Sequence, residues 1–137
     1  MSTQFDVIVV GGGIAGMACA VELAAQAGTR PVRGRIIPKE AVSGSNSVAG
    51  QGGMAALLHP AESTPSHVRD TITVGEGRND PAVVRRVVRE GPAVVRSLVG
   101  MGAAFDTNAT GQLELAREGG HTVARVVHHL DRTGAEI

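Results

Sequence analysis

The sequence predicts an α/β fold with parallel strands and several short helices. Residues 6–10 form a short, uninterrupted β-branched run, which is typical of a strand buried on both faces of a parallel sheet. Glycines follow at once, and apolar residues then recur at helical spacing until Gly28. A strand, a tight turn and a helix of about three turns, from near Gly13 to Gln26, are therefore expected at the start of the chain.

The next strand should return parallel to the first, and residues 35–39 are the only apolar-centred candidate. Pro31 and Gly34 precede this segment and Pro38 lies within it, so few ladder hydrogen bonds are available there. Residues 43–53 are small and polar, which predicts a loop that another group approaches closely. Apolar character resumes at residues 54–58.

Three helices are expected in the middle of the chain. Thr64 or Ser66 can cap a short one that the glycines at 75–77 end. Asp80 followed by a proline opens the second, and the Gly91–Pro92 pair should break it and start a third that ends near Gly102. A small hairpin or extended loop should follow around residues 108–111.

Composition and charge exclude some partners. The chain has 137 residues with 13 basic and 13 acidic side chains, so its net charge gives no reason to expect a nucleic acid or an anionic membrane. No apolar run approaches the roughly 20 residues of a membrane-spanning helix. The single cysteine cannot form an intrachain disulfide, which fits a reducing compartment and favours a cytoplasmic location.

The glycine turn carries a dinucleotide-binding pattern. Gly11-Gly12-Gly13-Ile14-Ala15-Gly16 follows the predicted strand and opens the helix, the setting of a Rossmann-like phosphate site. The helix N-terminus then faces the phosphates with unpaired N–H groups. A glycine turn that only tightens a strand–helix joint is the simpler alternative. A nicotinamide cofactor also stays open, because Glu40, 24 residues after Gly16, makes the expected acidic position inconclusive.

Two later motifs point to one family. Ser45-Asn46-Ser47-Val48-Ala49-Gly50-Gln51-Gly52-Gly53 and Arg117-Glu118-Gly119-Gly120-His121 resemble the fumarate reductase, succinate dehydrogenase and L-aspartate oxidase flavoprotein family. The other parts come in family order: the glycine turn, Lys39, residues 66–71, Phe105-Asp106 and residues 131–134. The resemblance implies that residues 1–137 are the N-terminal portion of an incomplete Rossmann-like FAD-binding domain, with the capping and C-terminal helical domains absent.

The resemblance implies FAD as the cofactor. Its expected contacts are Gly11, Gly13, Ile14, Ala15, Gly16, Lys39, Ser45, Asn46, Ser47, Val48, Ala49, Gly50, Gln51, Gly52 and Gly53. Gly50, Gly52 and Gly53 leave the backbone bare, so that N–H groups can reach the flavin and pyrophosphate. Respiratory members of the family carry a flavin-linked histidine at the position of Asn46. An amide cannot form that bond, so the FAD is expected to be bound noncovalently.

The same resemblance assigns a substrate. Glu118 is expected to orient L-aspartate by accepting a hydrogen bond from its ammonium group, because a carboxylate suits an amine and repels a dicarboxylate such as succinate. A solvated turn residue is the alternative for Glu118. His121 is expected to contact substrate or flavin, or else to hold the loop. No metal site is expected, since His128 and His129 are adjacent and cannot clamp one ion from a helix.

The implied reaction is FAD-dependent oxidation of L-aspartate to iminoaspartate, the first step of de novo NAD biosynthesis. Oxygen or fumarate would accept the electrons, and the quinolinate synthase of that pathway is an expected partner. The isolated chain is expected to be inactive, because the family's later substrate-clamping residues are not in the sequence. The alternatives are a succinate or fumarate oxidoreductase flavoprotein, which Asn46 and Glu118 disfavour, and a noncatalytic remnant.

Overall fold

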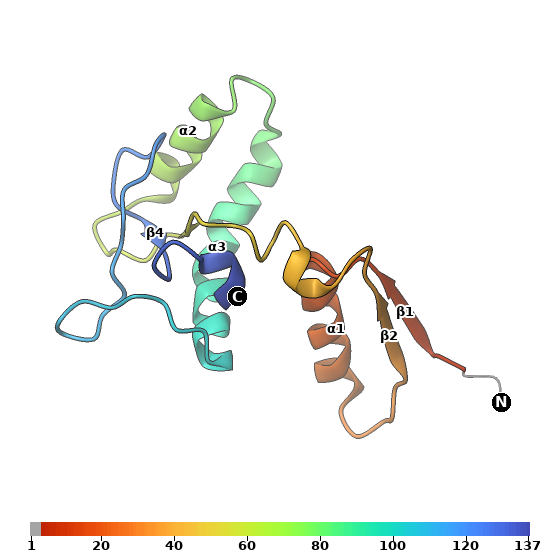
Figure 1. The fold of residues 1–137 in the computed structure, drawn as a ribbon. Coiled ribbons are helices and arrows are strands. Elements are labelled where there is room, and N and C mark those ends of the chain that lie inside the picture. The colour runs from red at the N-terminus through yellow and green to blue at the C-terminus, as the bar shows by residue number, and fades with distance from the viewer. Residues whose placement is uncertain (1–3) are drawn as a thin grey trace. The chain divides into compact units, whose positions relative to one another are not determined.

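The chain folds into two compact units. A computed structural model describes residues 4–137 and divides the chain into Met1–Gly50 and Gln51–Ile137 (Figure 1). Helices and a few strands are both present, and each unit has its own two-stranded sheet. This confirms the predicted α/β character.

The first unit is a strand, helix and parallel strand. Strand β1 (Val7–Val10) pairs with β2 (Gly34–Ile37), and α1 (Ile14–Ala27) connects them. The register runs from Val7 opposite Gly34 to Val10 opposite Ile37. The backbone N–H of Gly11 donates to Ile37 O at 3.0 Å, so the ladder continues into the turn. A short 3₁₀ helix, η1 (Val42–Gly44), follows β2. The weak second strand is thus confirmed, starting one residue and ending two residues earlier than expected.

Helix α1 begins and ends where its glycines predict. Gly13 is its N-cap and Gly28 its C-cap, with φ of 56° at the latter. None of its residues is buried, and Met17 and Val21 of its apolar face are 40% and 50% exposed. A two-stranded sheet covers too little of the helix to bury that face.

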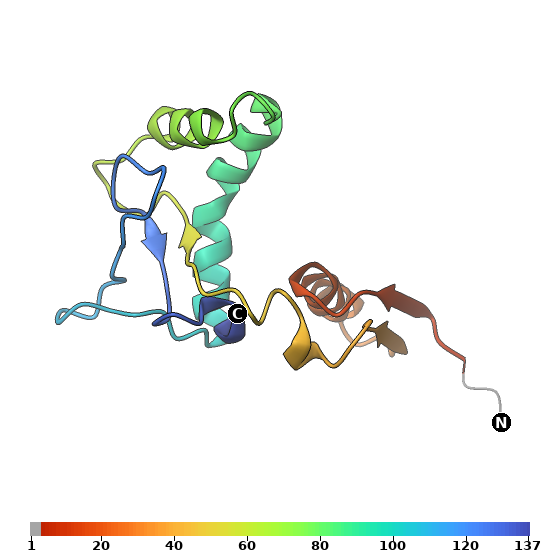
Figure 2. The same cartoon turned by 45° about the horizontal axis from the view of Figure 1, so that its top comes forward.

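The second unit is built around a helix and an antiparallel pair of strands. Strand β3 (Met54–Ala55) pairs with β4 (Val126–Val127), and these strands lie beside α3 (Pro81–Met101) (Figure 2). Helix α2 (Thr64–Val74) contacts α3, and α4 (Thr133–Glu136) follows β4. The core comprises Ala56, Val95, Phe105 and Val127. This antiparallel pair was not expected, since the predicted fold class named parallel strands.

Side chains cap α2 and α3 of the second unit. Asp80 Oδ1 accepts from the N–H groups of Ala82 and Val83, at 2.7 and 3.3 Å, as its position before a proline predicts. The cap of α2 is Ser63, whose hydroxyl accepts from Ser66 N at 3.4 Å, and not Thr64 or Ser66 as expected. Thr64 is instead the first residue of the helix.

Helix α3 is continuous across Gly91–Pro92, where a break was predicted. Proline removes one backbone hydrogen bond and costs about 3 kcal/mol inside a helix. The buried residues Val84, Val88 and Val95 nevertheless lie on one helical face, and Gly91 lies on the same face against Ala56. Because the apolar pattern stays in phase through the proline, packing on the core favours one helix over two.

The segment after α3 forms the expected small hairpin. Thr107 and Leu113 make an antiparallel bridge, and Asn108 N donates to Gln112 O at 2.8 Å. The Asn108 side chain accepts from Thr110 N at 2.9 Å, which closes the turn. In residues 4–137, no helix is long and apolar enough to cross a membrane.

Candidate functional site

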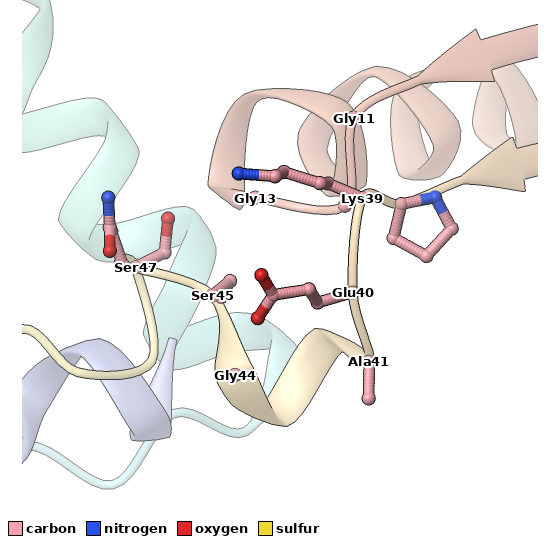
Figure 3. A pocket seen from close by; sticks show the side chains of 11 residues that line it. Gly11, Gly13, Lys39, Glu40, Ala41, Gly44, Ser45 and Ser47 are labelled. Carbon is pink, nitrogen blue, oxygen red and sulfur yellow. The ribbon is translucent and has the colours of Figure 1, made fainter.

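A cavity opens at the end of both strands of the first unit. It has a volume of about 390 Å³, within the usual range of ligand pockets. The lining comes from residues 11–13, which follow β1, from residues 38–41, which follow β2, and from residues 44–47 (Figure 3). Since parallel strands end at the same edge of a sheet, the turns that follow them meet there, as in other nucleotide-binding α/β folds.

The glycine turn brings α1 close to the end of β1. A Cβ on Gly16 would lie only 2.1 Å from Gly11 O and 3.0 Å from Gly11 C, so no side chain fits at position 16. Gly11 itself has φ of 119°, which other residues rarely adopt. These two glycines therefore allow the tight turn that aims the N-terminus of α1 at the cavity.

The first turn of α1 and the serine-rich loop are joined directly. Met17 N is the first helical N–H to bond back, to Gly13 O at 3.0 Å, so the preceding N–H groups have no partner within the helix. One of them, Ile14 N, donates to Ser47 Oγ at 3.1 Å. This bond connects the two motifs that were predicted to bind the cofactor.

Two charged side chains after β2 reach into the cavity. Figure 3 shows Lys39 and Glu40 extending into the space between the glycine turn and residues 44–47. Lys39 was expected there, and its ammonium suits a diphosphate. From the sequence, Glu40 was an inconclusive candidate for the acidic position of the motif. Its carboxylate suits the hydroxyls of a ribose. The sequence signal for Glu40 was its position 24 residues after Gly16, near the expected acidic position of the motif.

Residues 45–50 are folded into tight turns. Ala49 N donates to Ser45 O and Gly50 N to Ser47 O, both at 3.1 Å, and Val48 N donates to Ser45 Oγ at 3.3 Å. Ser45, Asn46 and Ser47 line the cavity; Val48, Ala49 and Gly50, like Ala15 and Gly16 of α1, do not. The structure thus brings together part of the predicted cofactor set.

The remaining motif residues lie in the second unit. Gln51 and Gly52 are exposed, and Gly53 N donates to Glu118 Oε1 at 3.4 Å. A Cβ on Gly53 would lie 2.3 Å from Val127 O, so the absent side chain makes room for β4 rather than only for a cofactor. Glu118 is exposed and connects two motifs that are 65 residues apart.

His121 lies at the end of the Glu118 turn. Its N–H donates to Glu118 O at 3.2 Å, and Gly120 before it has φ of 83°. His121 Nδ1 is 2.9 Å from Arg125 Nη1. The ring meets that of His67 edge to face, with centroids 5.9 Å apart.

A buried ion-pair cluster supports this turn and was not anticipated. The fully buried Arg125 pairs with Glu62 through Nε and with Asp70 through Nη1 at 2.7 Å. A backbone hydrogen bond from Thr122 lowers the pKa of Asp70 to about 2, assisted by Arg125 and opposed by burial. Burial, followed by the charge of Arg125 and the neighbouring His121, lowers the pKa of His67 to about 4 despite Asp70. The sequence signal for this cluster was Arg125 itself, a charged residue within an apolar segment.

The cavity of the first unit fits a dinucleotide phosphate. It combines a helix N-terminus with a tight glycine turn, serine hydroxyls and one lysine, which together suit a diphosphate anion. In the part of the chain that the structure describes, no three His, Cys, Asp or Glu side chains are grouped to hold a metal ion.

Comparison with known proteins agrees with this chemistry. The L-aspartate oxidase of Arabidopsis thaliana is 46% identical over 97% of this chain and 20% of its own length. That of Streptomyces coelicolor is 41% identical over 96% of the chain and 22% of its own length. The chain thus spans about a fifth of the length of the curated relatives that it matches.

Solved structures share the fold. A quinol fumarate reductase of E. coli superposes with a TM-score of 0.87 at 30% identity, over 98% of this chain and 23% of that one. Sdh1 of Mycobacterium smegmatis gives 0.85 at 31% identity, over 98% and 22%.

The family description names the cofactor. The sequence model described as FAD binding domain matches residues 6–137. FAD is therefore the cofactor that the glycine turn and its cavity fit. This chain belongs to the FAD binding domain family.

Proposed function

We propose that this chain is the FAD-binding N-terminal portion of an enzyme that oxidises L-aspartate to iminoaspartate, the first step of de novo NAD biosynthesis. The main support is its identity of 36–46% with L-aspartate oxidases over nearly all its length. Bound FAD would accept a hydride from the substrate. The residues of this chain would bind the cofactor and orient the amino acid.

The cofactor would be held mainly from its phosphates. The first-turn N–H groups of α1 and the Lys39 ammonium offer positive charge to the diphosphate, and Ser45, Asn46 and Ser47 offer donors around it. The Glu40 carboxylate would accept hydrogen bonds from the ribose. Asn46 has no nucleophilic nitrogen, so we propose that the flavin stays noncovalent.

Glu118 would select the substrate by charge. Its carboxylate lies against Gly53 of the Gln51–Gly53 motif, so an ammonium group bound at that motif would meet a negative partner. A dicarboxylate without an amine would meet repulsion there. His121, at the end of the same turn, would contact the substrate or the flavin.

We also propose an electron acceptor, a partner enzyme and a cellular location. Oxygen or fumarate would reoxidise the flavin, and the product would pass to quinolinate synthase. The single cysteine is compatible with a reducing cytoplasm. A succinate or fumarate oxidoreductase is the second candidate, and the TM-score of 0.87 with the E. coli quinol fumarate reductase favours it.

The test begins with the visible spectrum of the purified chain mixed with FAD. A perturbed flavin band that acid precipitation releases from the protein is expected, and colour that stays with the protein would contradict noncovalent binding. L-Aspartate and succinate are then titrated into the FAD-loaded whole enzyme of which this chain is the proposed N-terminal portion, and into its Glu118→Gln variant.

The two titrations separate the candidates. L-Aspartate should perturb the flavin at lower concentration than succinate, and Glu118→Gln should weaken aspartate binding by roughly tenfold, the factor of a charge-assisted hydrogen bond. Tighter binding of succinate than of aspartate would support the second candidate instead.

A further inference from the structure

Arg125 is a buried charge that connects three segments of the second unit. Its side chain is fully buried, and it contacts Glu62 before α2, Asp70 within α2, and His121 in the 117–121 turn. Burying a guanidinium costs several kcal/mol unless its donors are paired. Glu62 and Asp70 pair with Nε and Nη1 of Arg125, whereas its buried Nη2 has no partner among the described residues. The further contact of Nη1 with the His121 ring calls for its own explanation.

The chemistry of the two groups fixes the direction of this contact. A guanidinium donates hydrogen bonds and accepts none, because all its nitrogens carry or share protons. At 2.9 Å from Arg125 Nη1, the Nδ1 atom of His121 must therefore be the acceptor. An unprotonated Nδ1 places the proton of the neutral ring on Nε2.

The backbone that carries the ring is tied to the same cluster. Asp70 Oδ2, which pairs with Arg125, also accepts from the N–H and the hydroxyl of Thr122, both at 2.8 Å. The residue that follows His121 is thereby tied to the same carboxylate. His121 also lines a cavity of about 580 Å³ with His67 and apolar residues of α3.

We propose that Arg125 is the positioning residue of the 117–121 turn: it holds His121 as the Nε2–H tautomer, a hydrogen-bond donor for an anionic group of the substrate. Among the described contacts, none occupies Nε2 of His121. The part played in substrate binding rests on the proposed function, whereas the tautomer depends only on the contact with Arg125.

The tautomer can be measured directly by NMR on the whole ¹⁵N-labelled chain. Long-range proton–nitrogen correlations distinguish protonated from unprotonated imidazole nitrogens, and a His121→Gln spectrum assigns His121 among the five histidines. The expected result is an unprotonated Nδ1, a protonated Nε2 and a scalar coupling across the hydrogen bond from Arg125. An Nδ1–H tautomer, or no such coupling, would overturn the proposal.

A charge-balanced variant separates positioning from folding. Arg125→Met combined with Glu62→Gln and Asp70→Asn removes the buried charges together, a replacement that buried ion-pair clusters often tolerate. In this variant the tautomer ratio of His121 should shift by roughly tenfold toward the Nδ1–H form, the factor that about 1.4 kcal/mol gives. An unchanged ratio would show that Arg125 does not set it.

The outcomes distinguish this inference from the proposed function. If the triple variant fails to fold, the coupling in the native chain still decides the contact. Failure of L-aspartate to bind the FAD-loaded whole enzyme would refute the proposed function and leave the tautomer result standing. A mixed tautomer with normal aspartate binding would refute the role of Arg125 and leave the proposed function standing.

Discussion

The replacement of Gly16 by alanine tests the glycine turn most sharply. The added Cβ would lie 2.1 Å from Gly11 O, whereas ordinary contact begins at 3.4 Å, so α1 and the end of β1 must separate by about 1.3 Å. Overpacking of this kind costs about 3 kcal/mol when both sides are backbone. Alanine regains about 1 kcal/mol of helix propensity. The net loss of stability should therefore be about 2 kcal/mol.

The assay is urea unfolding followed by circular dichroism, because the chain has no Trp or Tyr for fluorescence. Gly34→Ala is the matched control: it lies in β2 of the same unit, and a Cβ there would meet nothing within 4 Å. That control should stay within about 0.5 kcal/mol of the native chain. Equal unfolding midpoints for the two variants would refute the argument from close approach.

Two further predictions concern the second unit. Gly53→Ala should destabilise this unit by about 2 kcal/mol, because the new Cβ would lie 2.3 Å from Val127 O. The control Gly119→Ala should change stability little, because a Cβ there would meet nothing within 4 Å. Equal urea midpoints for these two variants would contradict the prediction. Between pH 6.5 and about 4 the unfolded chain protonates His67 and the folded chain does not, so stability should fall by up to about 3 kcal/mol as the pH drops. Urea midpoints against pH measure this loss, which a His67→Gln variant should lack; Asp70 adds its own loss only below pH 3.8.

Local signals in the sequence predicted the first unit well. The β-branched run, the glycine turn and Gly28 placed β1 and α1 within a residue or two of their observed bounds. These features depend on interactions within a few residues of the chain, such as capping, backbone freedom and the helical period. The same holds for the Asp80 cap of α3.

Packing decided what those signals could not. Gly91–Pro92 is a helix-breaking pair by local rules, and only the burial of Val88 and Val95 on one face of the core keeps α3 continuous. The expected single cofactor loop is likewise divided, with residues 45–47 lining the first-unit cavity and Gly53 packed on β4. The composition of a loop predicts that another group can approach it closely. It does not predict whether that group is a cofactor or another segment of the chain.

The sequence by itself indicated a dinucleotide site, because a glycine turn between a strand and a helix is a local device for binding a diphosphate, and FAD in particular followed from the family resemblance and the family model. Tertiary structure alone decided that Arg125 is buried between Asp70 and His121, and that Glu118 contacts Gly53. The pairs of Arg125 with Asp70 and of Glu118 with Gly53 bring together residues that are 55 and 65 positions apart in the chain. Their energy comes from desolvation and pairing, which depend on the path of the whole chain and leave no periodic trace in the sequence.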